Sequence, residues 1–270
     1  NVTIAPGNVK AVYLDGAGSG AAVTDAFASL SVGAINDITS KAFGTSSIMI
    51  GDTTTGTISA ANYNVGLGVD VFAALTTGDN NVAVGFGALD ANTTASVNTA
   101  VGSNALGANI SGQQNVAVGA NSLDANTTGG DNVAVGTGAL GANTTAASNT
   151  AVGHLALTAN TTGTGHAALG QSALAANTTG TNNTGLGQVS LTANTTGASN
   201  VAVGRAALTA NTTGDNNTAV GMNAMVANTT GTDNVAVGAA SLDANTTGAE
   251  NTAVGKSSLT GNTTGDYNVA

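Results

Sequence analysis

The stretch Asn115–Asp131, NVAVGANSLDANTTGGD, decides the fold of this chain, because its pattern returns seven units later as NVAVGAASLDANTTGAE at Asn234–Glu250. Between Asn81 and Tyr267 the same 17-residue unit occurs eleven times without an insertion. A fixed period of this length predicts a solenoid, in which each copy buries its apolar face only against neighbouring copies. We therefore expect a stack of coils rather than a globular domain.

The repeat divides the chain into four parts. Residues 1–46 are not repetitive, and we expect them to form an N-terminal cap or an assembly segment. Residues 47–80 contain two degenerate repeats, which keep SIMIG and then NVGLG as the start of the unit. Residues 81–267 are the eleven regular repeats, and residues 268–270 begin an incomplete one. This last segment indicates either a fragment or a coil that another subunit completes.

Composition argues against several classes of function. The 270 residues include 39 Gly, 3% aromatic residues and no Cys, so small side chains must pack in thin layers, and disulfides and thiolate metal sites are excluded. Fourteen acidic residues against four basic ones argue against nucleic-acid binding. No apolar run reaches the roughly 18 residues of a membrane span. The N-terminus does not read as a signal peptide, so any targeting segment was removed or never existed.

The unit predicts β-strands. Seventeen residues are too few for two packed helices, so we expect an all-β protein, a parallel β-solenoid or β-roll of 17-residue coils that associates laterally or end to end. Numbering each unit from its opening Asn, positions two to four alternate between two faces. We assign position four to the core, as in Val84, Val101, Leu169, Leu186 and Val254.

A second strand is expected in the second half of each unit. Position nine is Leu in every regular unit except for Met225, and we expect it to face the core with position eleven, as in Leu123 and Ala125. Position five is always Gly, which enters positive φ without steric cost and permits the turn after the first strand. These predicted turn residues are Gly85, Gly102, Gly119, Gly136, Gly153, Gly170, Gly187, Gly204, Gly221, Gly238 and Gly255.

Position twelve is always Asn and is followed in most units by Thr-Thr-Gly, which predicts a turn. Stacked coils place equivalent side chains about 4.8 Å apart, so these amides should form a ladder in which each donates to the next. The predicted structural ladder comprises Asn92, Asn109, Asn126, Asn143, Asn160, Asn177, Asn194, Asn211, Asn228, Asn245 and Asn262.

Three other interpretations of the repeat compete with a structural one. Asn-Thr-Thr is a formal N-glycosylation sequon, but glycans about 5 Å apart would be crowded, so glycosylation is only an occasional addition. Threonine rows suggest an ice-binding face, although the paired Thr lie consecutively in a turn. Calcium-binding β-rolls repeat Gly-Gly-x-Gly-x-Asp, which is absent, and the irregular acidic residues favour a solvated edge.

Association between copies is expected from the same pattern. Positions two and eight carry Val, Thr, Ala and Ser, and they should leave a partly apolar stripe along the rod. Such a stripe favours lateral association, most simply a homotrimer. An end without a cap instead favours a head-to-tail homopolymer that grows by β-addition.

The run NTAVG-xx-AL-x-ANTTG-xx-NVAVG resembles the head repeats of trimeric autotransporter adhesins and, more closely, the NTAVG/NTTG repeats of phage tail-fibre and bacterial surface proteins. The resemblance covers residues 47–270. It implies a parallel β-roll or β-solenoid, commonly trimeric, that serves as a stiff extracellular shaft or adhesive head. Autotransporter heads usually repeat at fourteen to sixteen residues, so this chain departs from them in period.

No residues in the sequence suggest an active site. His154 and His166 stand at different positions of the unit, without a catalytic neighbour, and surface or ladder positions are expected for them. We expect no catalytic, cofactor-binding or metal-binding residues. The sequence favours a structural, extracellular fibre subunit used for surface attachment or filament building. The alternative is a binding module that presents a repeated face to a carbohydrate, a host receptor or ice.

Overall fold

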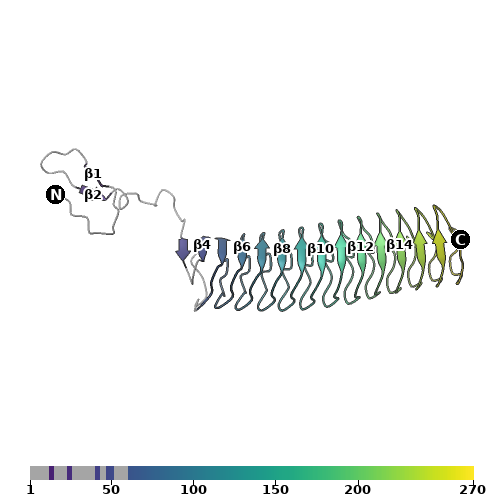
Figure 1. The fold of residues 1–270 in the computed structure, drawn as a ribbon, viewed down its shortest axis with the longest axis horizontal. Helices are drawn as coiled ribbons and strands as arrows, with labels where there is room; N and C mark the ends of the chain where they lie inside the picture. Colours follow the sequence, from purple (N-terminus) through teal and green to yellow (C-terminus); the bar gives the residue numbers. More distant parts are fainter. Residues whose placement is uncertain (1–11, 15–22, 26–39, 43–46, 52–59) are drawn as a thin grey trace.

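A computed structural model describes residues 12–14, 23–25, 40–42, 47–51 and 60–270 of this chain. The chain is an all-β parallel β-solenoid of about 12 turns with roughly 17 residues per coil, as the sequence predicts. Its coils stack along one axis, and each contributes one arrow to a continuous row of strands (Figure 1). Most of residues 1–46, the expected cap or assembly segment, lie outside the described residues.

The strands form two sheets. β1 (Val12–Leu14) and β2 (Val23–Asp25) pair antiparallel. The second sheet has 14 strands in sequence order from β3 to β16. Its members are β3 (Ser40–Ala42), β4 (Ile48–Gly51), β5 (Val65–Gly68), β6 (Val82–Val84), β7 (Thr99–Val101), β8 (Val116–Val118), β9 (Val133–Val135), β10 (Thr150–Val152), β11 (Ala167–Leu169), β12 (Thr184–Leu186), β13 (Val201–Val203), β14 (Thr218–Val220), β15 (Val235–Val237) and β16 (Thr252–Val254).

Neighbouring coils pair in register. From β4 onward each strand is parallel to the next, and residues 17 apart are partners, as in Val82 with Thr99 and Ala83 with Ala100. β3 is the exception, because it pairs antiparallel with β4 and ends the large sheet. Equivalent positions of the repeat therefore lie directly above one another through the stack.

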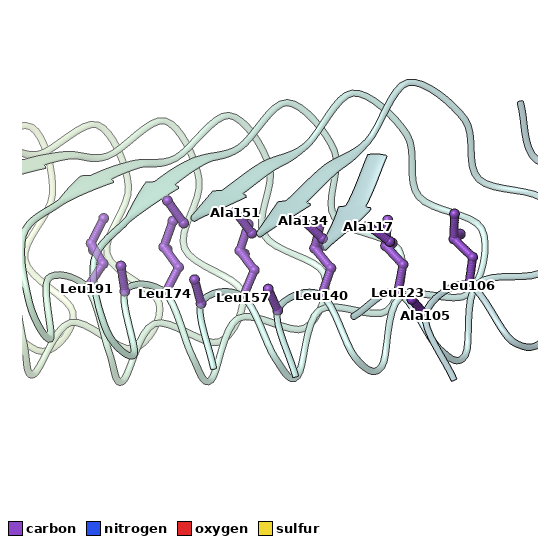
Figure 2. Packing of buried hydrophobic residues seen from close by; sticks show 14 of the residues in the cluster. Ala105, Leu106, Ala117, Leu123, Ala134, Leu140, Ala151, Leu157, Leu174 and Leu191 are labelled. Carbon is purple, nitrogen blue, oxygen red and sulfur yellow. The ribbon is translucent and has the colours of Figure 1, made fainter. Parts of the chain in front are cut away.

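The core consists of small and large aliphatic side chains that face each other. In the regular units, position three is a buried Ala (Gly185 in one unit) and position nine is a Leu (Met225 in one unit) that is buried everywhere except at Leu259, for example Ala134 and Leu140. Figure 2 shows the leucines rising from one side of the coil toward the alanines of the strands. A leucine opposite an alanine fills the space between the two walls of a thin coil without a void.

The assignment of position four to the core is wrong. Val101, Leu169 and Val254 are 36%, 43% and 61% exposed, and Val84 and Leu186 are partly exposed. Position three is inward instead, because the leucine at position nine already occupies the interior and leaves room only for an Ala or Gly opposite it. The alternation of faces is correct, but the larger side chains lie on the outside.

The second strand is also absent from the described coils. Positions six to ten form turns, and both position seven and position nine take a left-handed backbone, with φ of 53° at Asn121 and 51° at Leu123. A bulky residue rarely adopts this conformation. Since the backbone is not extended, positions nine and eleven do not share a face. Leu123 and Ser122 at position eight are buried, whereas Ala125 at position eleven is only half-buried.

Candidate functional site

The predicted asparagine ladder at position twelve is present, and it is buried except at the half-buried Asn262 in the last regular coil. Asn126 Nδ2 donates to Asn109 Oδ1 at 2.9 Å and to the carbonyl oxygen of Gly129, three residues ahead, at 3.0 Å. The next coil repeats the contact, with Asn143 Nδ2 2.9 Å from Asn126 Oδ1. One amide therefore joins two coils and also closes its own Asn-Thr-Thr-Gly turn.

A second ladder stands at position one, which sequence reasoning did not single out. Asn115 Oδ1 accepts two hydrogen bonds from Asn132, one from the backbone N–H at 3.0 Å and one from Nδ2 at 3.1 Å. Asn132 Nδ2 also donates to the Ala146 carbonyl oxygen at 2.9 Å. The available signal was the recurrence of Asn at position one in every regular unit except the one that begins with His166.

The polar groups of both ladders are satisfied inside the rod. Among the described residues, every buried side-chain nitrogen or oxygen has a hydrogen-bond partner. A buried amide left without partners would cost about 1–3 kcal/mol. The ladders therefore stabilise the contact between coils, and their amides are not exposed to an external ligand.

His166 replaces asparagine in the position-one ladder. Its Nδ1 accepts the backbone N–H of Asn183 at 3.2 Å, and its Nε2 lies 2.8 Å from the Gly180 carbonyl oxygen. An asparagine makes both of these contacts here through Oδ1 and Nδ2, although Asn115 Oδ1 also accepts a second hydrogen bond, from Asn132 Nδ2. They require a neutral ring with the proton on Nε2, and burial lowers the pKa of His166 below its ordinary value. His154 is exposed.

The glycines at position five lie where neighbouring coils approach each other closely. Their φ angles fall between 129° and 142°, a range that side chains rarely adopt. A Cβ atom on Gly170 would lie 2.6 Å from the carbonyl carbon and oxygen of Gly187 in the next coil. Gly255 in the last regular coil has nothing within 4 Å of this point. The turn at these positions requires glycine for its conformation, and the stack requires it for space.

Threonines at position thirteen add a third line of contacts. Thr127 Oγ1 donates to the Thr144 carbonyl oxygen at 3.0 Å, while Thr128 at position fourteen is exposed. The Asn126 amide of the same sequon is fully buried and donates two hydrogen bonds. A glycan therefore cannot occupy Asn126 Nδ2 while the stack is folded.

The outward face of the large sheet is largely aliphatic, with Thr at position two in five of the eleven regular coils. It consists of positions two and four, that is, the first and third residues of strands β6 to β16, preceded by Val65 and Leu67 of β5 and by Ile48 and Ile50 of β4. The expected stripe at positions two and eight is thus half right. Position eight is buried in most coils, as at Ser122, and position four takes its place. We call these two rows the outer sheet face.

Ionisable groups do not gather into a site in the part of the chain that the structure describes. No group of three His, Cys, Asp or Glu there could hold a metal ion. Burial raises the pKa of Asp90 and Asp124, which both stand at position ten. In the same part of the chain, no helix has the length and apolar character to cross a bilayer.

Comparisons with protein-family models, curated proteins and solved structures find no match for this chain. Its function therefore has to be argued from the repeat and its geometry.

Proposed function

We propose that this chain is a structural subunit of an extracellular fibre, a β-solenoid shaft or adhesin-like rod used for surface attachment or filament building. The observation that carries the proposal is the placement of the repeated residues. Asn at positions one and twelve, Gly at position five and Leu at position nine all join or space the coils, as at Asn115, Gly119, Leu123 and Asn126. Positions six and seventeen are exposed in most coils, positions seven and sixteen are half-buried in most, and all four vary freely.

Continuous bonding along the axis suits a rod. Each regular coil is tied to the next by the sheet, by two asparagine ladders or their histidine substitute, and by turn contacts such as Thr127 to Thr144. At about 4.8 Å per strand, β4 to β16 make a rod roughly 60 Å long. Bending such a rod would stretch several bonds in every coil on its convex side.

The resemblance to trimeric autotransporter heads and to NTAVG/NTTG fibre repeats supports the same role. In those families, rods of this kind lie outside the cell or on a virion and are commonly trimeric. We extend both expectations to this chain, so its main partner is a further copy of itself, and a host surface or polysaccharide is an additional partner. Net charge of −10 is consistent with a rod that stays dispersed in water.

Immunogold electron microscopy tests this proposal. Antibodies raised against the purified chain should label projecting fibres on the producing cells or particles, without permeabilisation. Antibodies preabsorbed with the purified chain are the control. Gold confined to the cell interior, or spread evenly over a surface without fibres, would refute the proposed role.

A binding module remains the alternative, and one observation favours it. Position four repeats Val or Leu as faithfully as the core positions repeat, yet it faces outward. A faithful exposed row indicates that something covers it. The adsorption of isolated rods to a polysaccharide, a host receptor or ice would support this alternative.

A further inference from the structure

We propose that the outer sheet face is the surface through which copies of this chain pack side by side. The inference rests on the proposed fibre role, and it names the surface and the orientation of the copies. The outer sheet face differs from the rest of the coil, where the side chains at positions six, sixteen and seventeen vary in charge and size.

The residue types on the outer sheet face are those of an interface. The two rows contain only Val, Ile, Leu, Thr and a single Ala from β4 to β16, and no charged residue interrupts them. Val118 and Val152 near the middle are 36% and 37% exposed, and Leu169 is 43% exposed. Single exposed aliphatic residues are ordinary, but an unbroken Val, Leu or Ile row at position four, beside a row of Val, Ile, Thr and Ala at position two, marks an interaction surface. β-Branched side chains on a sheet are suited to packing against a second sheet about 10 Å away.

The area of the outer sheet face is large enough for association between two copies. Thirteen strands at about 4.8 Å give a length of roughly 60 Å, and two rows of side chains give a width of about 10 Å. Each copy would thus bury roughly 600 Å², or about 1,200 Å² for a pair, which is the lower bound for a stable interface. A strip of this length is matched by another rod with the same repeat, because both have the same spacing along the axis.

Charge at the two edges favours parallel copies. In the regular units, position seventeen before the strands carries the exposed Asp131, Asp233 and Glu250, and position six after them carries the exposed Arg205 and Lys256. These two positions carry no other Asp, Glu, Lys or Arg in the regular units. A rotation about an axis parallel to the rod brings the leading edge of one sheet opposite the trailing edge of its neighbour. Acidic and basic edges then face each other. If one rod is instead reversed end to end about an axis parallel to its strands, the strands of both rods run in the same direction. The acidic edges would then lie together, which is unfavourable.

Analytical ultracentrifugation of the full chain tests the inference. Between about 1 and 100 μM, the range expected for an interface of this size, the wild type should sediment as a dimer or trimer of the 25.4 kDa chain. The double variant Val118→Lys/Val152→Lys places unpaired charges in the buried strip, so association should weaken at least about 100-fold. Its circular dichroism should match that of the wild type, because neither side chain enters the core.

A matched control adds the same charge elsewhere. Thr128→Lys/Thr145→Lys alters two exposed residues at position fourteen, outside the outer sheet face, and should associate like the wild type. If the valine-to-lysine variant does not fold, Val118→Thr/Val152→Thr replaces methyl groups with hydroxyls of similar size. Its association should be about tenfold weaker.

Three results would overturn the inference. The first is a wild type that stays monomeric throughout this concentration range. The second is a lysine variant that associates as tightly as the wild type. The third is a monomeric wild type that binds to growing ice or to insoluble polysaccharide, together with a Val118→Lys/Val152→Lys variant that does not. This result would assign the outer sheet face to that ligand. None of these results bears on where the fibre lies, so a failure here is distinguishable from a failure of the immunogold test.

Discussion

Replacing a single position-five glycine tests whether close stacking holds the rod together. In Gly170→Ala, the new Cβ would lie 2.6 Å from Gly187 O, and ordinary contact begins near 3.4 Å. The next coil would have to retreat by about 0.8 Å. The hydrogen bond from Gly187 N to Leu169 O, now 2.8 Å, would then lengthen to about 3.6 Å and be lost.

The expected magnitude follows from two separable terms. A non-glycine residue at the φ of 137° found at Gly170 costs about 1–3 kcal/mol. One or two broken bonds between coils add about 0.5–1.5 kcal/mol each. Gly170→Ala should therefore lower the free energy of unfolding by about 1.5–6 kcal/mol. The substitution acts in mid-stack, so it should also weaken the coupling between the coils on either side.

Two controls separate the terms. Gly255→Ala has a φ of 129° but nothing within 4 Å, so it should show only the conformational cost of about 1–3 kcal/mol. Gly107→Ala, in the second regular coil, meets its nearest atom at 3.4 Å, and other coils carry Asp, Thr or Ala at this position, so it should change stability by less than about 0.5 kcal/mol.

Urea unfolding followed by circular dichroism measures the three variants, with amide hydrogen exchange of β10 to β12 as the local readout. The exchange data matter because a repeat array can unfold in parts, and a single midpoint then understates a local lesion. If Gly170→Ala and Gly255→Ala are equally destabilised, or if Gly170→Ala loses less than about 1 kcal/mol, the stacking argument is wrong.

Three further substitutions test the interior, each measured by urea unfolding. Asn177→Leu removes an amide 2.9 Å from Asn160 Oδ1 and should cost about 2–4 kcal/mol, whereas the exposed Thr179→Leu should be nearly neutral; similar losses in both would contradict the buried ladder. Burial lowers the folded-state pKa of His166 below 6.5, so as the pH decreases the unfolded chain is protonated before the folded one. The free energy of unfolding should therefore decrease as the pH is lowered below about 6.5, by at most about 1.4 kcal/mol per pH unit. His166→Asn should lack this component, and identical pH profiles would refute it. Leu174→Ala empties a fully buried position and should cost about 2–5 kcal/mol, against a smaller loss for half-buried Leu259→Ala in the last regular coil; equal losses would argue against a tightly packed core.

Periodicity predicted the stack, its parallel register and the ladder of Asn126 because each follows from equivalent residues lying above one another. The inward face was mispredicted because hydrophobicity ranks valine above alanine. In a thin coil, the space opposite Leu140 decides instead, and it admits only Ala134. The left-handed backbone of Leu123 could not be predicted either, since bulky residues avoid it and only the contacts of the complete stack hold it there.

The position-one ladder was predictable in principle from the recurrence of asparagine beside the strand. Its chemistry is visible only in three dimensions, since Asn132 contacts Asn115 in the preceding coil and Ala146 fourteen residues ahead. His166 in the same row shows which property the position selects. It needs one acceptor and one donor at a fixed separation, and a neutral imidazole supplies both.

Equivalent residues pair at a constant offset of 17, and this has a genetic consequence. Recombination between misaligned repeats of the gene would add or delete whole coils while leaving every remaining contact unchanged. Each such event would lengthen or shorten the rod by about 4.8 Å. The length of the rod could then vary between relatives in fixed increments without the evolution of any new contact. The number of repeats in the gene would set the length of the rod directly.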